Sequence, residues 1–182
     1  MKPATQESEA PASASESDVE RFVPGRLFFN ERIDLPAGLS RGEIESAIET
    51  QLEAISPFSP EQLYWGAYID ASRTQAFLYA VAKESFAPAE AGVADGEPWY
   101  PGFLPFLGYV AEAPGVLCAV SGHSVALLVF DQPGALPSEA HCVEMASDEV
   151  DDETGRRVAA DVLRARPWVQ LPVEDAGFRF DS

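Results

Sequence analysis

The sequence is poor in basic residues and almost lacks histidine. It carries 12 lysines and arginines against 30 aspartates and glutamates, with two histidines and a formal net charge of −18. A field of this sign repels phosphate backbones and anionic lipid headgroups. Nucleic acid and a bare membrane surface are therefore not expected as partners. The acidic residues are spread along the chain, which is typical of a solvated surface.

Cysteine is also scarce, because Cys118 and Cys142 are the only two in the chain. Two cysteines do not make the disulfide framework of a small secreted domain. Both lie in apolar, strand-like runs, which favours free buried thiols, with a single disulfide between strands as the alternative. Residues 1–20 lack the apolar core of a signal peptide, so we expect a cytoplasmic location.

Long apolar runs are limited to residues 113–130, which contain no Asp, Glu, Lys or Arg. A membrane-spanning helix needs about 20 apolar residues. This run has Pro114 and Gly115 at its start and the polar residues 121–124 in its middle. The pattern favours a β-hairpin across 121–124, and no membrane span is expected.

Motifs for phosphate and metal binding are missing. Neither G-x-x-x-x-G-K-[ST] nor G-x-G-x-x-G occurs. Cys118, His123, His141 and Cys142 are metal-ligand types, but His141 and Cys142 are neighbours in a predicted strand and point to opposite faces. The acidic residues 147–153 lack the glycine and ligand order of a calcium loop and are interpreted as a helix start. No cofactor and no metal are expected.

One segment approaches a catalytic motif. Residues 122–126 read Gly-His-Ser-Val-Ala, close to the G-x-S-x-G elbow of serine hydrolases. A predicted strand precedes it, but residues 125–130 are β-formers where a helix should follow. His141 is the sole histidine downstream. A small serine hydrolase that uses Ser124 is therefore kept as the alternative function.

The pattern of elements predicts a mixed α and β chain in four parts. Residues 1–22 form a disordered acidic tail, 23–84 a first lobe, 85–112 a connection and 113–182 a second lobe.

The first lobe has the clearest pattern. We predict a strand over 26–35 and a helix from the capping box Ser40–Glu43 to about Ala54. Two strands follow, at 63–69 and 74–82. Residues 76–81 are apolar on both faces, which predicts a strand covered on both sides.

The connection holds the densest aromatic cluster of the chain. Its prolines and glycines allow a short helix near 86–91, and the aromatic run after it predicts a buried helix over 103–111. The alternative is a partner-binding patch. The candidate interaction residues are Phe58, Trp99, Tyr100, Phe103 and Phe106.

The second lobe is predicted to begin with the hairpin 115–120 and 125–131. A third strand over 140–145, a helix ending near Arg164 and a last short strand at 177–180 follow.

Residues 33–84 resemble the assembly-platform proteins of the PilM and GspL type, which are actin-like components of type IV pilus and type II secretion machines. The resemblance runs through Ile33-Asp34-Leu35-Pro36-Ala37-Gly38-Leu39-Ser40, the helix that follows, Ile55-Ser56-Pro57-Phe58-Ser59-Pro60-Glu61 and the strand ending at Ala82-Lys83-Glu84. The chain departs from the family where a nucleotide-binding strand and loop should precede Arg26. It departs again at residues 119–122, where an acidic residue and a glycine are expected.

The resemblance implies a degenerate actin-like (ribonuclease H-like) two-lobe fold with mixed sheets that has lost ATP binding. It further implies a non-enzymatic cytoplasmic scaffold, held at the inner membrane through a protein partner of the assembly complex. A homodimer is the alternative partner, and a nucleotide-binding actin-like protein is a further alternative function.

Overall fold

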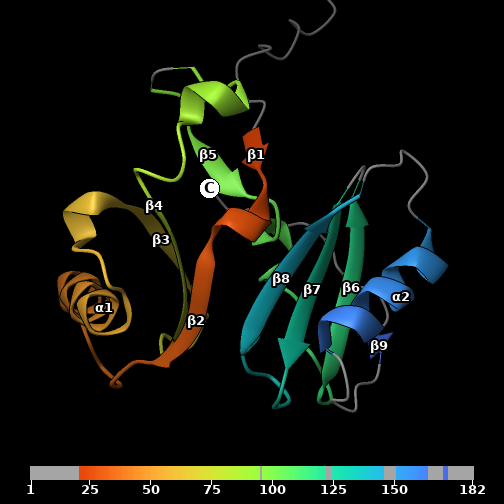
Figure 1. The fold of residues 1–182 in the computed structure, drawn as a ribbon. Coiled ribbons are helices and arrows are strands. Elements are labelled where there is room, and N and C mark those ends of the chain that lie inside the picture. The colour runs from red at the N-terminus through yellow and green to blue at the C-terminus, as the bar shows by residue number, and fades with distance from the viewer. Residues whose placement is uncertain (1–20, 95, 122–123, 146–150, 164–169, 172–182) are drawn as a thin grey trace, which may run out of the picture.

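The computed structural model describes residues 21–94, 96–121, 124–145, 151–163 and 170–171. Within these residues two sheets face each other, with one α-helix on the outer side of each (Figure 1). The strands are β1 (Arg21–Val23), β2 (Phe29–Asp34), β3 (Leu63–Ile69), β4 (Gln75–Ala82), β5 (Trp99–Pro101), β6 (Gly115–Ser121), β7 (Ser124–Phe130), β8 (Glu139–Glu144) and β9 (Gln170–Leu171). The helices are α1 (Arg41–Ile55) and α2 (Asp152–Leu163), with short 3-10 turns η1 (Gly25–Leu27), η2 (Pro60–Gln62), η3 (Pro88–Ala91) and η4 (Leu104–Phe106). The predicted mixture of α and β structure is confirmed.

The first lobe is an antiparallel sheet in the order β2-β4-β3, covered by α1. The predicted capping box is present, because the Ser40 amide and hydroxyl donate to Glu43 Oε2 at 2.8 and 2.6 Å. These bonds lower the pKa of Glu43 and hold the first turn of α1. The buried stripe Ile44, Ile48 and Leu52 then packs on the sheet.

The second lobe is a sheet in the order β8-β7-β6-β9, covered by α2. Strands β6 and β7 pair in antiparallel register from Gly115↔Phe130 to Ser121↔Ser124, as the predicted hairpin requires. None of the helices formed by the described residues is long and apolar enough to cross a membrane. Strand β9 was not predicted, and the strand predicted at 177–180 lies outside the described residues.

The main core lies between the two sheets. Strand β4 is buried on both faces, as predicted: Phe77 and Val81 enter the shared core, whereas Ala76 and Leu78 pack under α1. Strand β7 has the same division, with Ala126, Leu128 and Phe130 in the shared core and Val125, Leu127 and Val129 under α2. The two lobes therefore share one interior and stabilise each other.

Three expectations for the connecting segments and element boundaries are wrong. Residues 21–22 were assigned to the tail, but they belong to β1, which pairs in parallel with β5. The predicted helix over 103–111 is replaced by the single turn η4, because Pro105 lacks an amide hydrogen and Gly108 disfavours helix. The first predicted strand also begins later, at Phe29, since η1 occupies residues 25–27.

Each cysteine sulfur lies against a glycine. A Cβ at Gly25 would come within 2.5 Å of Cys142 Sγ, and a Cβ at Gly155 within 2.8 Å of Cys118 Sγ. Neither cysteine forms a disulfide, as the sequence predicted. Cys118 belongs to the core under α2 and Cys142 packs against the core between the sheets, so the two sulfurs are on opposite faces of the second sheet.

Candidate functional site

An aromatic groove opens beside the first lobe, where β5 approaches β3. It has a volume of about 350 Å³. We define the aromatic groove by its lining residues, Phe28, Tyr64, Trp65, Tyr79, Glu97, Pro98, Trp99, Tyr100 and Pro101. The aromatic rings of this groove come from four separate segments, which explains why no single stretch of sequence predicted the groove.

Strand pairing positions the central ring of this groove. Strand β1 pairs with β5 in register Phe22↔Tyr100, which fixes residues 99–101 above the first sheet (Figure 1). The Trp99 ring then lies edge-to-face with Tyr64 at 5.3 Å and close to Phe86 at 5.0 Å. Such contacts hold an indole in one orientation, so the wall of the groove is preorganised.

The floor of the groove depends on a glycine. Gly66 pairs across the sheet with Tyr79, and a Cβ at Gly66 would lie 2.6 Å from the Tyr79 hydroxyl. The Tyr79 ring therefore lies flat over the β3 backbone. Burial raises the pKa of Tyr79 to about 12, and the neighbouring Tyr100 adds to this shift. The Tyr79 hydroxyl therefore stays protonated at neutral pH and is not suited to act as a base.

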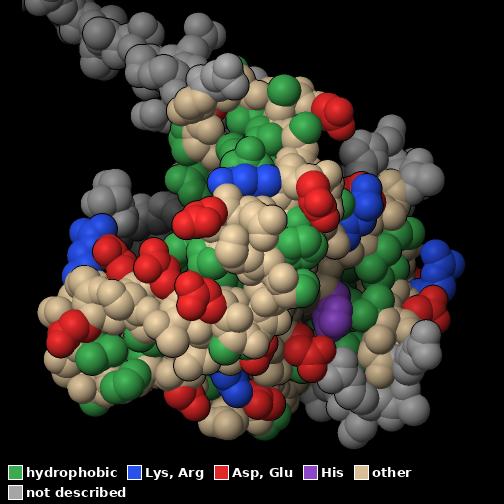
Figure 2. All heavy atoms as spheres, turned by 60° about the vertical axis from the view of Figure 1, so that its left-hand side comes forward, with side chains coloured by type: hydrophobic (Ala, Val, Ile, Leu, Met, Phe, Trp, Pro, Cys, Tyr) green, Lys and Arg blue, Asp and Glu red, His purple; other side chains and the backbone are tan. Residues whose placement is uncertain are grey.

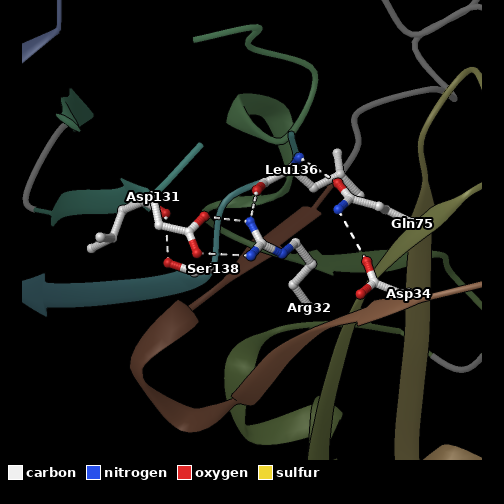
Figure 3. A network of polar contacts seen from close by, with 7 residues as sticks. Arg32, Asp34, Gln75, Asp131, Leu136 and Ser138 are labelled. Carbon is white, nitrogen blue, oxygen red and sulfur yellow. Dashed lines mark hydrogen bonds and ion pairs between the residues drawn. The ribbon is translucent and has the colours of Figure 1, made fainter. Parts of the chain in front are cut away.

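A polar seam joins the two lobes on another side of the molecule. Arg32 of β2 forms a bidentate ion pair with Asp131, with Nη–Oδ distances of 2.6 and 2.9 Å, and also donates to the Leu136 carbonyl (Figure 3). The ion pair raises the pKa of Arg32 and lowers that of Asp131. Gln75 continues the seam by contacting Asp34 and accepting from the Leu136 amide.

Asn30 completes this polar seam, because its side chain makes the pair of backbone hydrogen bonds that a neighbouring strand would make. Its side-chain amide donates to the Ala140 carbonyl and accepts from the Ala140 amide, both at 2.8 Å. One side chain thus links β2 to β8 with the paired bonds of a β-ladder. The seam satisfies backbone groups and fixes the lobes relative to each other, so its role is structural.

The residues predicted for interaction are divided by the structure. Trp99 and Tyr100 line the aromatic groove and are half-buried, and Phe58 is half-buried beside Leu52 and Leu63. Phe103 and Phe106 belong to the interior, where they are 0% and 6% exposed. The structure therefore brings Trp99 and Tyr100 together with Tyr64, Trp65 and Tyr79, which the sequence did not single out.

The geometry around Ser124 does not form a nucleophile elbow. Ser124 begins β7 and lies opposite Glu144 in an antiparallel pair, whereas the elbow requires a sharp turn from strand to helix. His141 lies opposite Leu127, about 10 Å further along the sheet. The only other histidine, His123, lies outside the described residues. The hydrolase alternative therefore lacks its required geometry.

The described residues contain no group of three or more His, Cys, Asp or Glu side chains placed to hold a metal. His141 Nε2 instead contacts Glu139 at 2.9 Å, and burial with the charge of Glu144 raises the pKa of the Cys142 thiol to about 12. Of the acidic residues in 147–153, Asp148 and Glu149 lie outside the described residues, whereas Asp151, Asp152 and Glu153 lie at the start of α2, as predicted. Figure 2 shows acidic side chains spread over one face of the molecule rather than gathered in a patch.

The fold and the groove define a two-lobe module with a preorganised aromatic surface. No protein-family model and no curated protein matches the sequence. Among solved structures, the chain is similar to the cytoplasmic domain of EpsL, an inner membrane component of the type II secretion system of Vibrio cholerae. The identity is 14%, the match covers 70% of this chain and 52% of that one, and the TM-score is 0.41.

The chain is also similar to the PilM–PilN type IV pilus biogenesis complex, at 18% identity, 65% and 40% coverage and a TM-score of 0.41. A third structure is a Bacteroides thetaiotaomicron protein with an actin-like ATPase fold and unknown function, at 11% identity, 76% and 49% coverage and a TM-score of 0.37. The chain spans about half the length of these structures. These similarities name the same kinds of protein as the sequence resemblance, and neither a family nor an activity is carried over from them.

Proposed function

We propose that this protein is a non-enzymatic scaffold that works by binding another protein through the aromatic groove. The supporting observation is the groove itself, in which half-buried Trp99 and Tyr100 meet Tyr64 and Trp65 around a volume of about 350 Å³. Tryptophan and tyrosine dominate the binding energy of protein interfaces because they bury a large area at a small entropy cost. The proposed setting, a pilus or secretion assembly platform at the inner membrane, rests on the sequence resemblance of residues 33–84.

Proximity labelling in the native cell tests this proposal. A labelling enzyme fused to the wild-type chain should mark pilus or secretion assembly proteins. Trp99→Ala should reduce that labelling about tenfold or more, because loss of a central aromatic anchor costs more than 1.4 kcal/mol of binding free energy. Val110→Ala is the matched control, since Val110 is 70% exposed and is not one of the residues lining the groove.

Labelling of unrelated proteins, or equal labelling by Trp99→Ala and the wild type, would refute the scaffold proposal. The nucleotide-binding alternative is tested separately. The sequence lacks both glycine-rich phosphate loops, so ATP with magnesium should leave the melting temperature unchanged. A clear rise would favour an actin-like nucleotide-binding protein, and a homodimer would be recognised by sedimentation.

A further inference from the structure

Strand β3 has one paired side and one open side. The first sheet has the order β2-β4-β3, so β3 is at its edge. Among the described residues, β3 forms a ladder with β4 alone. An edge strand presents unpaired amides and carbonyls that another chain can use as a template.

The direction of these backbone groups follows from the register. In an antiparallel pair, every second residue exchanges bonds with its partner, and the residues between them point outward. The Lys83 amide bonds to Gln62 O at 2.9 Å, and the Asp70 amide to Gln75 O at 3.1 Å. The even-numbered positions of β3 therefore face β4. The amides and carbonyls of Trp65, Ala67 and Ile69 point to the open edge.

The same three residues line a second groove, between β3 and α1. Its volume is about 880 Å³. We define the edge groove by its lining residues, Arg41, Ile44, Glu45, Ile48, Trp65, Ala67, Ile69, Asp70, Ala71 and Arg73. Ile69 is 38% exposed there, one of the few large apolar side chains on the described surface. Open backbone groups and an apolar groove thus lie along one strand.

Charge identifies what kind of chain fits this edge. The Asp70 carboxylate accepts bonds from Thr74 and Gln75, and Glu45 pairs with Arg41 at 3.3 Å. Arg73 is exposed and forms no ion pair with any described residue. Of the four charged side chains that line the groove, Arg73 is therefore the one whose charged donors are open to an incoming chain. It complements a carboxylate.

We propose that an extended segment of a partner protein adds to the first sheet as a new strand on the open edge of β3. Its backbone bonds to Trp65, Ala67 and Ile69, its alternate apolar side chains enter the edge groove, and a carboxylate pairs with Arg73. Trp65 lines both grooves, so a strand added on the open edge of β3 lies next to the aromatic groove. The inference rests on the proposed scaffold function and specifies the chemistry of its partner.

Hydrogen exchange of a protein–peptide complex tests the inference directly. The probes are short peptides selected from a random display library on the intact wild-type chain and then synthesised. The amides of Trp65, Ala67 and Ile69 should exchange rapidly in the free protein and about tenfold or more slowly with peptide bound. The amides of Tyr64, Gly66 and Tyr68 serve as internal controls, because β4 already protects them.

Substitutions at the edge should weaken the selected peptides in a defined way. Ala67→Pro removes an outward amide that is not part of the ladder, and should weaken binding about tenfold or more. Arg73→Gly removes the charge and also relieves a positive φ of 57° at that residue, so it should stay folded. It should reduce affinity for peptides that contain Asp or Glu, but not for versions with Asn or Gln in their place.

The selected peptides should alternate apolar residues and contain a carboxylate. Peptides that bind without slowing the three outward amides would overturn the inference. Protection of the same amides that rises with protein concentration, without peptide, would also overturn it and point to a second copy of this chain. Retained peptide binding in Trp99→Ala, together with proximity labelling equal to that of the wild type, would refute the aromatic groove as the partner site while leaving the edge site standing.

Discussion

The two lobes use the same plan but treat the edges of their sheets differently. Each is a sheet with one helix on its outer face, and their inner faces share one core. In the second lobe, β9 covers the β6 edge, and Asn30 bonds to the backbone of Ala140 in β8. In the first lobe, the β3 edge has no such cover among the described residues.

The covered edges of the second lobe serve stability, whereas the open edge of the first lobe is available for binding. Open edges are usually blocked in soluble proteins because they promote aggregation. The second lobe follows that rule with a strand and with the polar seam. The first lobe leaves β3 open beside two grooves, so the surface available to partners belongs mainly to the first lobe.

The largest effect should come from the interior that both lobes share. Phe103 is fully buried and makes edge-to-face contacts with Phe28, Phe77 and Tyr79. Phe103→Ala should lower the free energy of unfolding by about 3–5 kcal/mol. Chemical denaturation measures the loss, with half-buried Phe58→Ala as a milder control. If hydrogen exchange accelerated in only one lobe, the shared-core comparison would be wrong.

A middle-sized effect is expected where the first lobe closes the edge of the second. Asn30→Ala leaves the amide and carbonyl of Ala140 without their side-chain partner, and should cost about 2 kcal/mol. Asn30→Asp keeps an acceptor for the amide alone and should fall between wild type and Asn30→Ala. Thermal unfolding compares the three. An unchanged melting temperature in Asn30→Ala would show that β8 does not need this cover.

The smallest effect concerns the ion pair of the polar seam and its pH dependence. The pKa of Asp131 is lowered in the folded state, so its contribution is complete above the unfolded value of about 3.9 and is lost as the pH falls through the folded value. Arg32→Met should cost about 1 kcal/mol at neutral pH, since Asp131 is solvent-exposed, and should flatten the acid side of the stability curve. Denaturant titrations between neutral and acid pH measure both effects.

Arg41→Met is the control for that ion pair, because the Arg41–Glu45 pair lies on the exposed surface of α1 and should contribute only a few tenths of a kcal/mol. If Arg32→Met and Arg41→Met lowered the free energy of unfolding by the same amount across the pH range, the polar seam would not be the link between the lobes that we describe.

Local signals in the sequence predicted much of the first lobe. The Ser40–Glu43 capping box located the start of α1, and the alternation of residues 63–69 located β3. The apolar run on both faces of β4 correctly indicated a strand that is buried on both sides. These features depend on neighbours close in the chain, which explains why periodicity detects them.

The candidate site was harder to predict because it depends on pairing between distant segments. Strands β1 and β5 have three residues each and are 75 or more residues apart, so neither has a detectable period. Their pairing positions Trp99 against Tyr64, and the sequence identified only the first of these rings. Phe103 and Phe106 belong to the same aromatic run, but Pro105 turns that run into the interior.

The two thiols that lie against glycines allow local opening of the structure to be measured through their rates of alkylation. Cys118 Sγ is enclosed where α2 packs on the second sheet, and Cys142 Sγ where η1 packs on β8. A reagent reaches the buried Cys118 sulfur only when Gly155 moves away, and the half-buried Cys142 sulfur becomes more accessible when Gly25 does. Each labelling rate therefore responds to the separation of one packing boundary. Without any engineered probe, alkylation kinetics can therefore distinguish detachment of the outer helix from parting of the two lobes.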